Sequence, residues 1–424
     1  MFREGYRTAT VRESVPEPLF PRALTDRTFF HSSEHQRAKW IAVPIALWAV
    51  LWFGVSTIWV EGRWTVSILE AATFVLSAVA VLQNRWRATP HWSVWCLATV
   101  AGWGLMQITL RWTVVFAQTE WAILYWLAAA CLVALGTLIP DRESFLSGLL
   151  WFGAAMSALA LAQLYTSHGQ ILWFIPTPEK DQIFGTFPNQ NHYAAFIELL
   201  FPLALWRALK NEKYGWVYAG IASLMYGSVI ASASRAGTIL VTLELAAVLV
   251  LTTGGRHFRS RLILVLAGVV AFALVAGPGA VWQRLLAPDP YAMRREYLDS
   301  AIAMLRARPL EGFGLGTWTS AYPAYAVADF GVVANHAHSE WGQWGAEGGV
   351  GVVALMAALF VLALWKGIRS VWAIGLAAVM LHALVDYPLV RLGLGCWWFA
   401  MLGIAVREDA SAGCTNSNRP KQPA

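Results

Sequence analysis

One long polar stretch, from Trp282 to Trp341, stands between apolar segments and is dense in Arg, His, Asp and Gly. A bilayer excludes unpaired charge and irregular backbone. Basic side chains kept together outside the apolar segments therefore predict a site that holds an anion. The residues that suggest this are Arg284, Arg294, Arg295, His336 and His338.

The composition is typical of a polytopic membrane protein. Of the 424 residues, 58% are hydrophobic, 13% are charged and 24 are Trp. Windows of about 18 apolar residues predict an all-α integral membrane fold with about twelve spans. These begin near Trp40, Trp64, His91, Trp121, Phe145, His192, Trp216, Ala236, Arg261, Gly348, Val371 and Gly395.

Basic residues concentrate in alternate loops, which predicts the orientation, because short loops rich in Lys and Arg stay cytoplasmic. The N-terminal segment to Lys39 holds seven of them. Both termini are then cytoplasmic, and the segments around Gly185, Arg235 and His338 are periplasmic in a bacterial inner membrane. The net charge of +6 reflects this topology and anionic lipid, so no nucleic-acid partner is expected.

The simplest organisation is one membrane domain. We expect a cytoplasmic N-terminal tail over 1–39, a polytopic domain over 40–406 with a periplasmic loop at 282–341, and a disordered cytoplasmic tail over 407–424. The four cysteines lie in predicted spans or in the C-terminal tail, without metal-ligand spacing. Neither a disulfide framework nor a zinc site is predicted, and no cofactor is implied.

Two short motifs fall at predicted outer helix ends. Residues 184–192 read FGTFPNQNH, in which Asn189 and Asn191 can cap the next helix. The motif is either only a capped helix start or a helix N-terminus that, with His192, faces an anion. In Ser-Arg-Ala-Gly at 234–237, Arg235 either anchors to lipid or contacts phosphate. Its place in an outer loop, where Arg is disfavoured, supports the phosphate contact.

The long loop holds two further motifs. Residues 291–306 predict an amphipathic helix with Leu298, Ile302 and Leu305 on one face, followed by a glycine turn at 312–316 with no preceding strand, which excludes a dinucleotide site. Residues 335–351 read NHAHSEWGQWGAEGGVG. His338 can bond phosphate or act as a base, with His336 and Glu347 as further contacts. Metal chelation by the two histidines is a lesser alternative without a third ligand.

Four acidic residues lie inside predicted spans and need partners or a function. Glu70, Glu198 and Glu244 suit an ion or solute path, so a multispan transporter for an anion such as bicarbonate is the alternative class, although no inverted repeat is evident. His382 and Asp386, four residues apart, are predicted to pair and support the site. A structural scaffold would leave the outer Arg and His residues unexplained.

The ordered set GTFPNQNHYAAF, SRAG, RPLEGFGLGTW and AHSEWGQWGAEGGVG resembles the O-antigen ligase and O-antigen polymerase family of bacterial envelope glycosyltransferases. The resemblance covers roughly residues 184–386. It implies a GT-C-like membrane fold of about a dozen helices with a periplasmic loop of short helices over the site. Gln190 departs from the usual Asn-Pro-Asn-His motif, in which Pro is common.

The resemblance also implies an activity: metal-independent transfer or polymerisation of a glycan from an undecaprenyl-diphosphate-linked donor. The acceptor would be a glycan, a lipid A core or a protein. Arg235 matches the first diphosphate-contacting Arg of the family, and Arg294 matches the second better than Arg295 does. His338 matches the catalytic His. The sequence leaves ligase and polymerase open.

Overall fold

The computed structural model describes residues 43–60, 62–83, 90–177, 183–252, 257–276, 292–327, 331 and 333–416. The chain divides into two units, Met1–Ala42 and Val43–Ala424, and every described residue belongs to the second. The predicted N-terminal tail 1–39, Arg284 and the first part of the predicted periplasmic loop lie outside the described residues.

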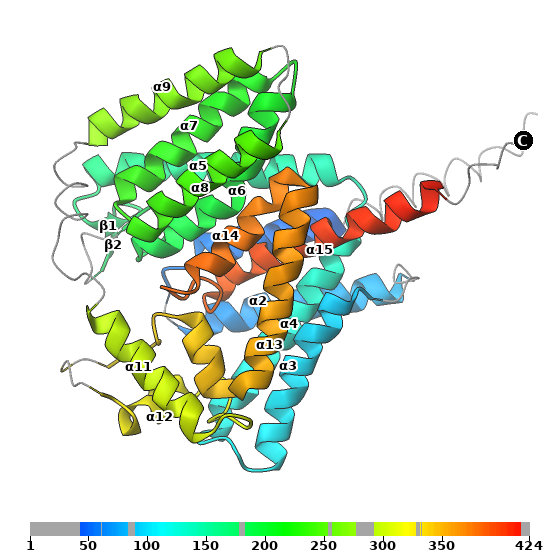
Figure 1. Ribbon diagram of the computed structural model, residues 1–424, viewed down its shortest axis with the longest axis vertical. Coiled ribbons are helices and arrows are strands. Elements are labelled where there is room, and N and C mark those ends of the chain that lie inside the picture. Colours follow the sequence, from blue (N-terminus) through cyan, green and yellow to red (C-terminus); the bar gives the residue numbers. More distant parts are fainter. Residues whose placement is uncertain are drawn as a thin grey trace, which may run out of the picture. The chain divides into compact units, whose positions relative to one another are not determined.

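Helices make up most of the described chain (Figure 1). The first part forms the helix Val43–Ser56, α2 (Arg63–Leu82), α3 (Trp92–Thr109), α4 (Phe116–Thr137) and α5 (Arg142–Thr166). A short antiparallel pair, β1 (Gln170–Ile171) and β2 (Ile175–Pro176), precedes α6 (Gln190–Lys210), α7 (Gly215–Ser232), α8 (Arg235–Leu251) and α9 (Phe258–Ala276). The last part forms α11 (Ala292–Ala307), α12 (Trp318–Ala321), the 3-10 turns η2 (Tyr322–Ala324) and η3 (Val371–Ala373), α13 (Glu340–Arg369), α14 (Ile374–His382) and α15 (Leu392–Asn416).

The predicted all-α membrane class agrees with these helices, since the predicted spans begin near helix starts, except that the span from Gly348 begins inside α13 (Glu340–Arg369). Four described helices, α2, α4, α5 and α13, are long and apolar enough to cross a membrane. By contrast, α14 has only nine residues, about 14 Å at 1.5 Å per residue, against a bilayer core of about 30 Å. The number of twelve spans therefore stays a prediction.

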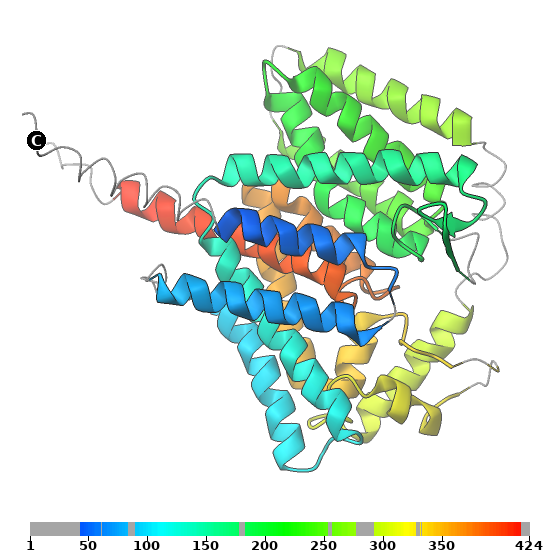
Figure 2. The same cartoon turned by 180° about the vertical axis from the view of Figure 1, so that it is seen from behind.

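Helix α6 lies at the centre of the packing. It contacts α5, α7, α8 and α14, and nearly every side chain from His192 to Leu209 is buried. Figure 2 shows the helix Val43–Ser56 between α5 and α2. It touches α15 through two glycines, because a Cβ on Gly54 would lie 3.0 Å from the Cα of Gly393. The residues that α6 carries are thus held from all sides.

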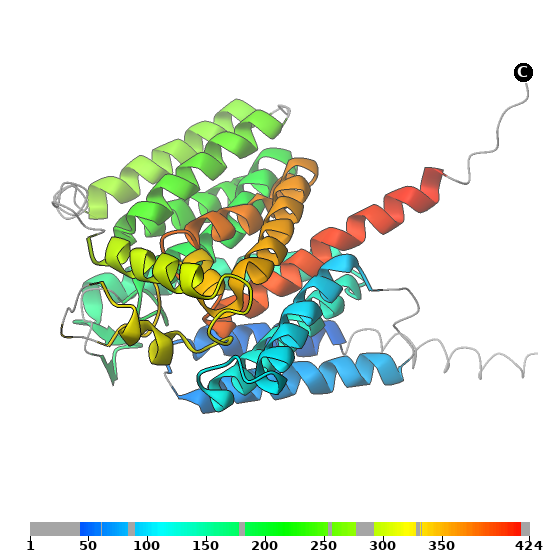
Figure 3. The ribbon, with the colours of Figure 1, turned by 60° about the horizontal axis from the view of Figure 1, so that its bottom comes forward.

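The segment predicted as the outer loop carries α11, α12 and η2. The amphipathic helix predicted over 291–306 is confirmed by α11 (Ala292–Ala307), which packs beside the first part of α13 (Figures 1 and 3). Its buried side is Tyr297, Ala301 and Met304, whereas Leu298 and Ile302 of the predicted apolar face remain 36% and 37% exposed. Leu298 and Leu305 nonetheless face α13, because a Cβ on Gly342 or on Gly345 would lie 3.1 Å from Leu298 or 3.3 Å from Leu305.

The glycine turn docks on a kink in α13. Gly349 has φ +72° and ψ −174° inside that helix, and its neighbour Val350 donates its N–H to the carbonyl of Pro309 at 2.8 Å. The Gln107 side chain of α3 donates to the carbonyls of Glu311 and Glu347 at 2.7 and 2.8 Å. These hydrogen bonds join the segment before the glycine turn to the first part of α13 through backbone groups, so the two segments are held together.

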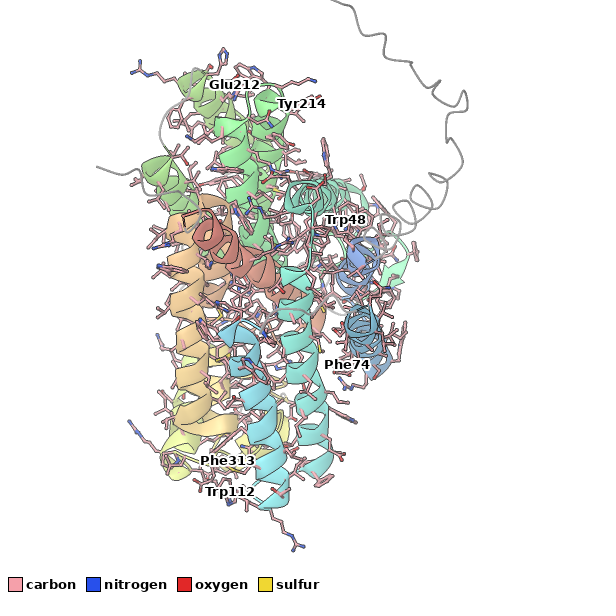
Figure 4. The ribbon with its side chains drawn as sticks, turned by 90° about the vertical axis from the view of Figure 1, so that its right-hand side faces the viewer. Trp48, Phe74, Trp112, Glu212, Tyr214 and Phe313 are labelled. Carbon is pink, nitrogen blue, oxygen red and sulfur yellow. The ribbon has the colours of Figure 1, made fainter. Side chains whose placement is uncertain are left out.

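Segments predicted to be outer and segments predicted to be inner lie at opposite ends of the described helices. Figure 4 shows Trp112 and Phe313 together at one end, and Glu212 and Tyr214 of the α6–α7 loop at the other. Val114 donates its N–H to the carbonyl of Phe313 at 3.0 Å, which ties the α3–α4 loop to the glycine turn. The separation fits the predicted topology, whereas the side of the membrane on which each end lies stays a prediction.

The tail predicted to be disordered from residue 407 is helical as far as Asn416, because α15 continues. Ala410 and Ala412 in this stretch have high helix propensity. Residues 417–424 lie outside the described residues.

Replacing Gly349 by Ala should destabilise the protein. A Cβ there would lie 2.3 Å from the carbonyl oxygen of Leu310, and the positive φ adds strain of about 1–3 kcal/mol for a non-glycine residue. We expect the thermal midpoint in detergent, followed by tryptophan fluorescence, to fall by several degrees. Gly351→Ala is the matched control, because nothing lies within 4 Å of its added Cβ. Equal midpoints for both variants would contradict the role of the kink.

Candidate functional site

Asp386 is a fully buried carboxylate in the turn between α14 and α15. Its Oδ2 lies 3.3 Å from Nη2 of Arg294 on α11, and its Oδ1 lies 3.5 Å from Nε2 of His192 on α6. Arg294 also donates through Nη1 to the carbonyl of Val385 at 2.5 Å. One acidic group therefore joins three elements that are far apart in the sequence.

Tyr387, the next residue, gathers three histidines around its ring. The ring of His336 stacks on it at 4.2 Å between centroids, and the rings of His192 and His338 meet it edge-on at 4.6 and 5.0 Å. His338 also stacks on Tyr297 of α11 at 5.7 Å. Of the predicted site residues, His192, Arg294, His336 and His338 are thus brought together.

His338 has an unusual backbone, with φ +49°, a region that a residue with a side chain rarely occupies. It stands just before Ser339, whose Oγ caps α13 by accepting the N–H of Gly342 at 3.3 Å. The N–H of Glu340 at the start of that helix donates to the carbonyls of Ala383 and Asp386 at 2.9 and 3.2 Å. The surrounding contacts therefore fix the strained residue beside the Asp386 turn.

The electrostatics of the cluster favour neutral histidines beside ionised Asp386. Burial, with the charges of Arg391 and His192, lowers the pKa of His336 to about 3. Burial likewise lowers the pKa of His338 to about 4, with help from Arg294 and against the opposing effect of Asp386. Burial alone would raise the pKa of Asp386, but His192 and Arg294 outweigh it and hold that pKa below its ordinary value.

The two outer helix-end motifs are linked to each other. Asn189 caps α6 by accepting the N–H of Asn191 at 2.8 Å. The amide oxygen of Asn191 accepts the hydroxyl of Ser234, the cap of α8, at 2.8 Å. A Cβ on Gly237 would lie 2.4 Å from that of Ala194, so the small residue permits this close approach. The start of α8 is therefore fixed against the start of α6, one residue from His192.

Arg235 is the first residue of α8 and is half-exposed. Among the described residues its guanidinium has no hydrogen bond or ion pair. A cation at a helix N-terminus that has no anionic partner in the described part of the chain is suited to binding an anion.

Two predicted substrate contacts lie apart from the histidine cluster. Glu347 is buried, and its carboxylate accepts the N–H groups of Gly316 and Trp318 at 2.8 and 3.0 Å and the amide of Gln343 at 3.0 Å. It holds the glycine turn. Arg295 is exposed on α11, on a different side from Arg294.

Two of the three acidic residues proposed for an ion path have basic partners. Glu70 pairs with Arg63 at 2.8 Å. Glu198 pairs with Nδ1 of His382 at 2.8 Å, so the predicted pairing of His382 with Asp386 is wrong. Glu198 approaches the imidazole from the neighbouring helix, whereas Asp386 accepts a hydrogen bond from Arg294 and lies 3.5 Å from Nε2 of His192. Both oxygens of Glu244 are buried without a hydrogen-bond partner among the described residues. Only one of the three carboxylates proposed for an ion path thus lacks a partner in that part of the chain.

His336 and His338, considered above as metal ligands, belong to no group of three or more His, Cys, Asp or Glu side chains that could hold a metal ion in the described part of the chain.

The residues that sequence reasoning missed are aromatic and basic: Tyr297, Tyr387 and Arg391. Arg391 could have been found, because it follows a predicted outer turn, where Arg is disfavoured, just as at Arg235. Aromatic residues are too common in this sequence to stand out.

Comparison with known proteins gives one family match. Residues 220–356 match the family model described as O-antigen ligase. No curated protein matches the chain. The matched segment includes Arg235, α11 with Arg294, and the loop with His336 and His338, which agrees with the resemblance drawn from the sequence motifs.

The neutral histidines predict a pH dependence of stability. An unfolded histidine titrates near pH 6.5, so between about pH 6.5 and 4 the unfolded chain binds protons that folded His336 and His338 do not. Stability should therefore fall as the pH falls through this window. The lowered pKa of Asp386 changes the pH dependence of stability only below this window. We expect the thermal midpoint to drop by several degrees between pH 7 and 4.5, and by less in His338→Gln. Exposed His257→Gln is the control and should keep the full slope; an unchanged slope in His338→Gln would contradict the assignment.

Proposed function

We propose that this chain, which matches the O-antigen ligase family model over residues 220–356, is a membrane glycosyltransferase of polysaccharide biosynthesis. Its proposed donor is a glycan on undecaprenyl diphosphate. The reaction takes place where α6, α8, α11 and the turn after α14 meet. It breaks the bond between the anomeric carbon and the diphosphate oxygen. A new bond forms from that carbon to the acceptor oxygen, and the lipid diphosphate leaves.

Arg294 and Arg235 supply the charge that the leaving group needs. Negative charge grows on the diphosphate as the bond breaks, and fixed guanidinium groups stabilise it without rearranging. Arg294 is fixed by Asp386 and Val385. The cap of α8 fixes the backbone of Arg235, and the diphosphate would order its guanidinium. Each charge-assisted contact contributes about 1.5–3 kcal/mol.

His338 accepts the proton of the acceptor hydroxyl as the new bond forms. A base must be deprotonated to act, and burial keeps the pKa of His338 near 4, so the ring is neutral at pH 7. Its place between Tyr297 and Tyr387 fixes its plane. The proton then passes to the departing diphosphate or to water.

Asn189, Asn191 and Arg295 are proposed as outer contacts to the substrate, and Glu347 as a positioning residue for the glycine turn.

The observation that carries the proposal is the convergence of Arg294, His336, His338 and His192 on one Asp-Tyr pair. His192 and His338 lie in two motifs of the family-like set, and Arg294 lies on the helix before a third. A purely structural role for a buried histidine cluster with one strained member, beside two arginines, has no evident reason. The donor, the periplasmic location and the choice between ligation and polymerisation are parts of this proposal.

The glycan profile of a deletion strain tests the function. We expect complementation by the wild-type gene to restore surface polysaccharide. If the deletion leaves polymer on the lipid carrier that never reaches lipid A, the chain is a ligase; if only single repeat units are transferred, it is a polymerase. An unchanged profile, with an unchanged undecaprenyl-linked pool, would reject glycosyl transfer and favour the anion transporter.

Single substitutions test the roles of Arg294 and His338. We expect Arg294→Gln and His338→Gln to lower the transfer rate at least about 100-fold, as for the loss of one electrostatic or general-base contribution, in purified protein that elutes as a single species. Arg306→Gln on the same helix is the control, since that side chain is exposed, and it should keep wild-type rates. A smaller loss in Arg294→Gln than in Arg295→Gln would assign the second diphosphate contact to Arg295.

A further inference from the structure

A second polar pocket borders the histidine cluster. It has a volume of about 160 Å³ and lies between the helix Val43–Ser56, the start of α2 and the start of α15. Figure 2 shows these two N-terminal helices side by side. Its walls include Thr57, Thr65, His336 and Arg391. A cavity of about 150 Å³ holds a six-membered ring, so a pocket of this size accommodates one sugar ring or a substituent of similar size.

Arg391 is the charged residue of the wall. No Asp or Glu is among the described residues that line the pocket. Arg391 lies over the ring of Tyr387 at 6.0 Å, and its Nε is buried without a hydrogen-bond partner. Its guanidinium makes no hydrogen bond or ion pair with the described residues. A partly buried cation without a counter-charge is costly, and an anionic ligand would remove that cost.

His336 forms the wall that the pocket shares with the histidine cluster. His336 lines the pocket, and its ring stacks on Tyr387, which also touches His338. Its Nδ1 is buried without a partner among the described residues. A group held in the pocket therefore lies next to the proposed base. Arg235 and Arg294, the proposed diphosphate contacts, do not line the pocket.

We propose that this pocket is the acceptor subsite, in which Arg391 and His336 bind an anionic substituent, a phosphate or a carboxylate, on the acceptor sugar. The identity of the ligand as an acceptor rests on the proposed glycosyl transfer; the anion site itself rests on the pocket. Arg391 makes and breaks no bond. It places the acceptor hydroxyl beside His338, and the diphosphate of the donor binds on the other side of the cluster.

A thiol reporter tests the anion site without any glycan. Thr57→Cys places a thiol on the pocket wall, and Ser56→Cys places one on the neighbouring residue, which is exposed and is not part of that wall. Two methanethiosulfonate reagents of opposite charge, the anionic sulfonatoethyl and the cationic trimethylammonioethyl compounds, are compared in the full chain in lipid nanodiscs. Rates are expressed relative to a free thiol in solution, and the parent chain without the added cysteine gives the background.

We expect the anionic reagent to be favoured at least about tenfold at the thiol of the Thr57→Cys variant, since a confined cation raises the local concentration of anions. Arg391→Gln in the same background should bring the preference close to one, and inorganic phosphate should slow the anionic reagent only when Arg391 is present. The Ser56→Cys variant should show no dependence on Arg391. A preference that survives Arg391→Gln, or a thiol in the Thr57→Cys variant that neither reagent reaches, would overturn the anion site.

Steady-state kinetics then distinguish an anionic substituent on the acceptor from the diphosphate of the donor as the ligand of Arg391. With purified donor lipid and acceptor, Arg391→Gln should raise the KM of the acceptor by about 10- to 100-fold, the loss of one charge-assisted contact, with kcat and the KM of the donor changed by less than about threefold. A rise in the KM of the donor instead would overturn the acceptor assignment, because Arg391 would then contact the diphosphate. If the wild-type chain transfers no glycan, the proposed function fails and the acceptor assignment with it, whereas the thiol result still decides the anion site.

Discussion

Burial of the Asp386 charge is the constraint on which the site depends. A carboxylate without exposed surface is stable only if cations or N–H groups surround it, and here they come from α6, α11 and its own turn. Removing one partner of such a buried pair typically costs about 3–5 kcal/mol. Arg294 and His192 are therefore held in place by the same interaction that assembles the helices. A site built in this way is fixed before any substrate arrives.

The kinked helix α13 connects the Asp386 turn to the glycine turn at 312–316 and holds both in place. Its N-terminus bonds the Asp386 turn, and Glu340 accepts the N–H of Val390 at 2.5 Å. Nine residues further on, Gly349 breaks the helix and receives the glycine turn, while Glu347 and Gln107 bond the backbone of that turn. His338 stands at the N-terminal end of this arrangement. Its strained backbone is tolerated because both flanking segments are anchored.

Local patterns in the sequence predicted the positions of the helices, the helix over 291–306 and the residues of the histidine cluster. They failed where a partner comes from a distant element. Spacing of four along one helix suggested His382 with Asp386, but Glu198 on α6 is closer to the imidazole. Tyr387 carried no signal, because an aromatic ring that organises three histidines is indistinguishable by sequence from one that only packs.

Compensation of charge distinguishes the three arginines of the site. Arg294 already pairs with a carboxylate, so its charge is partly neutralised and its geometry is fixed. Such a group orients a bound anion more than it attracts one. Arg235 and Arg391 have no acidic partner among the described residues, and each stands at the start of a helix or of the turn before one. These two retain their full attraction for an anion. The proposed transfer needs two such cations, one for the diphosphate of the donor and one for the anionic substituent of the acceptor, and of the two only Arg391 lines the pocket beside His336.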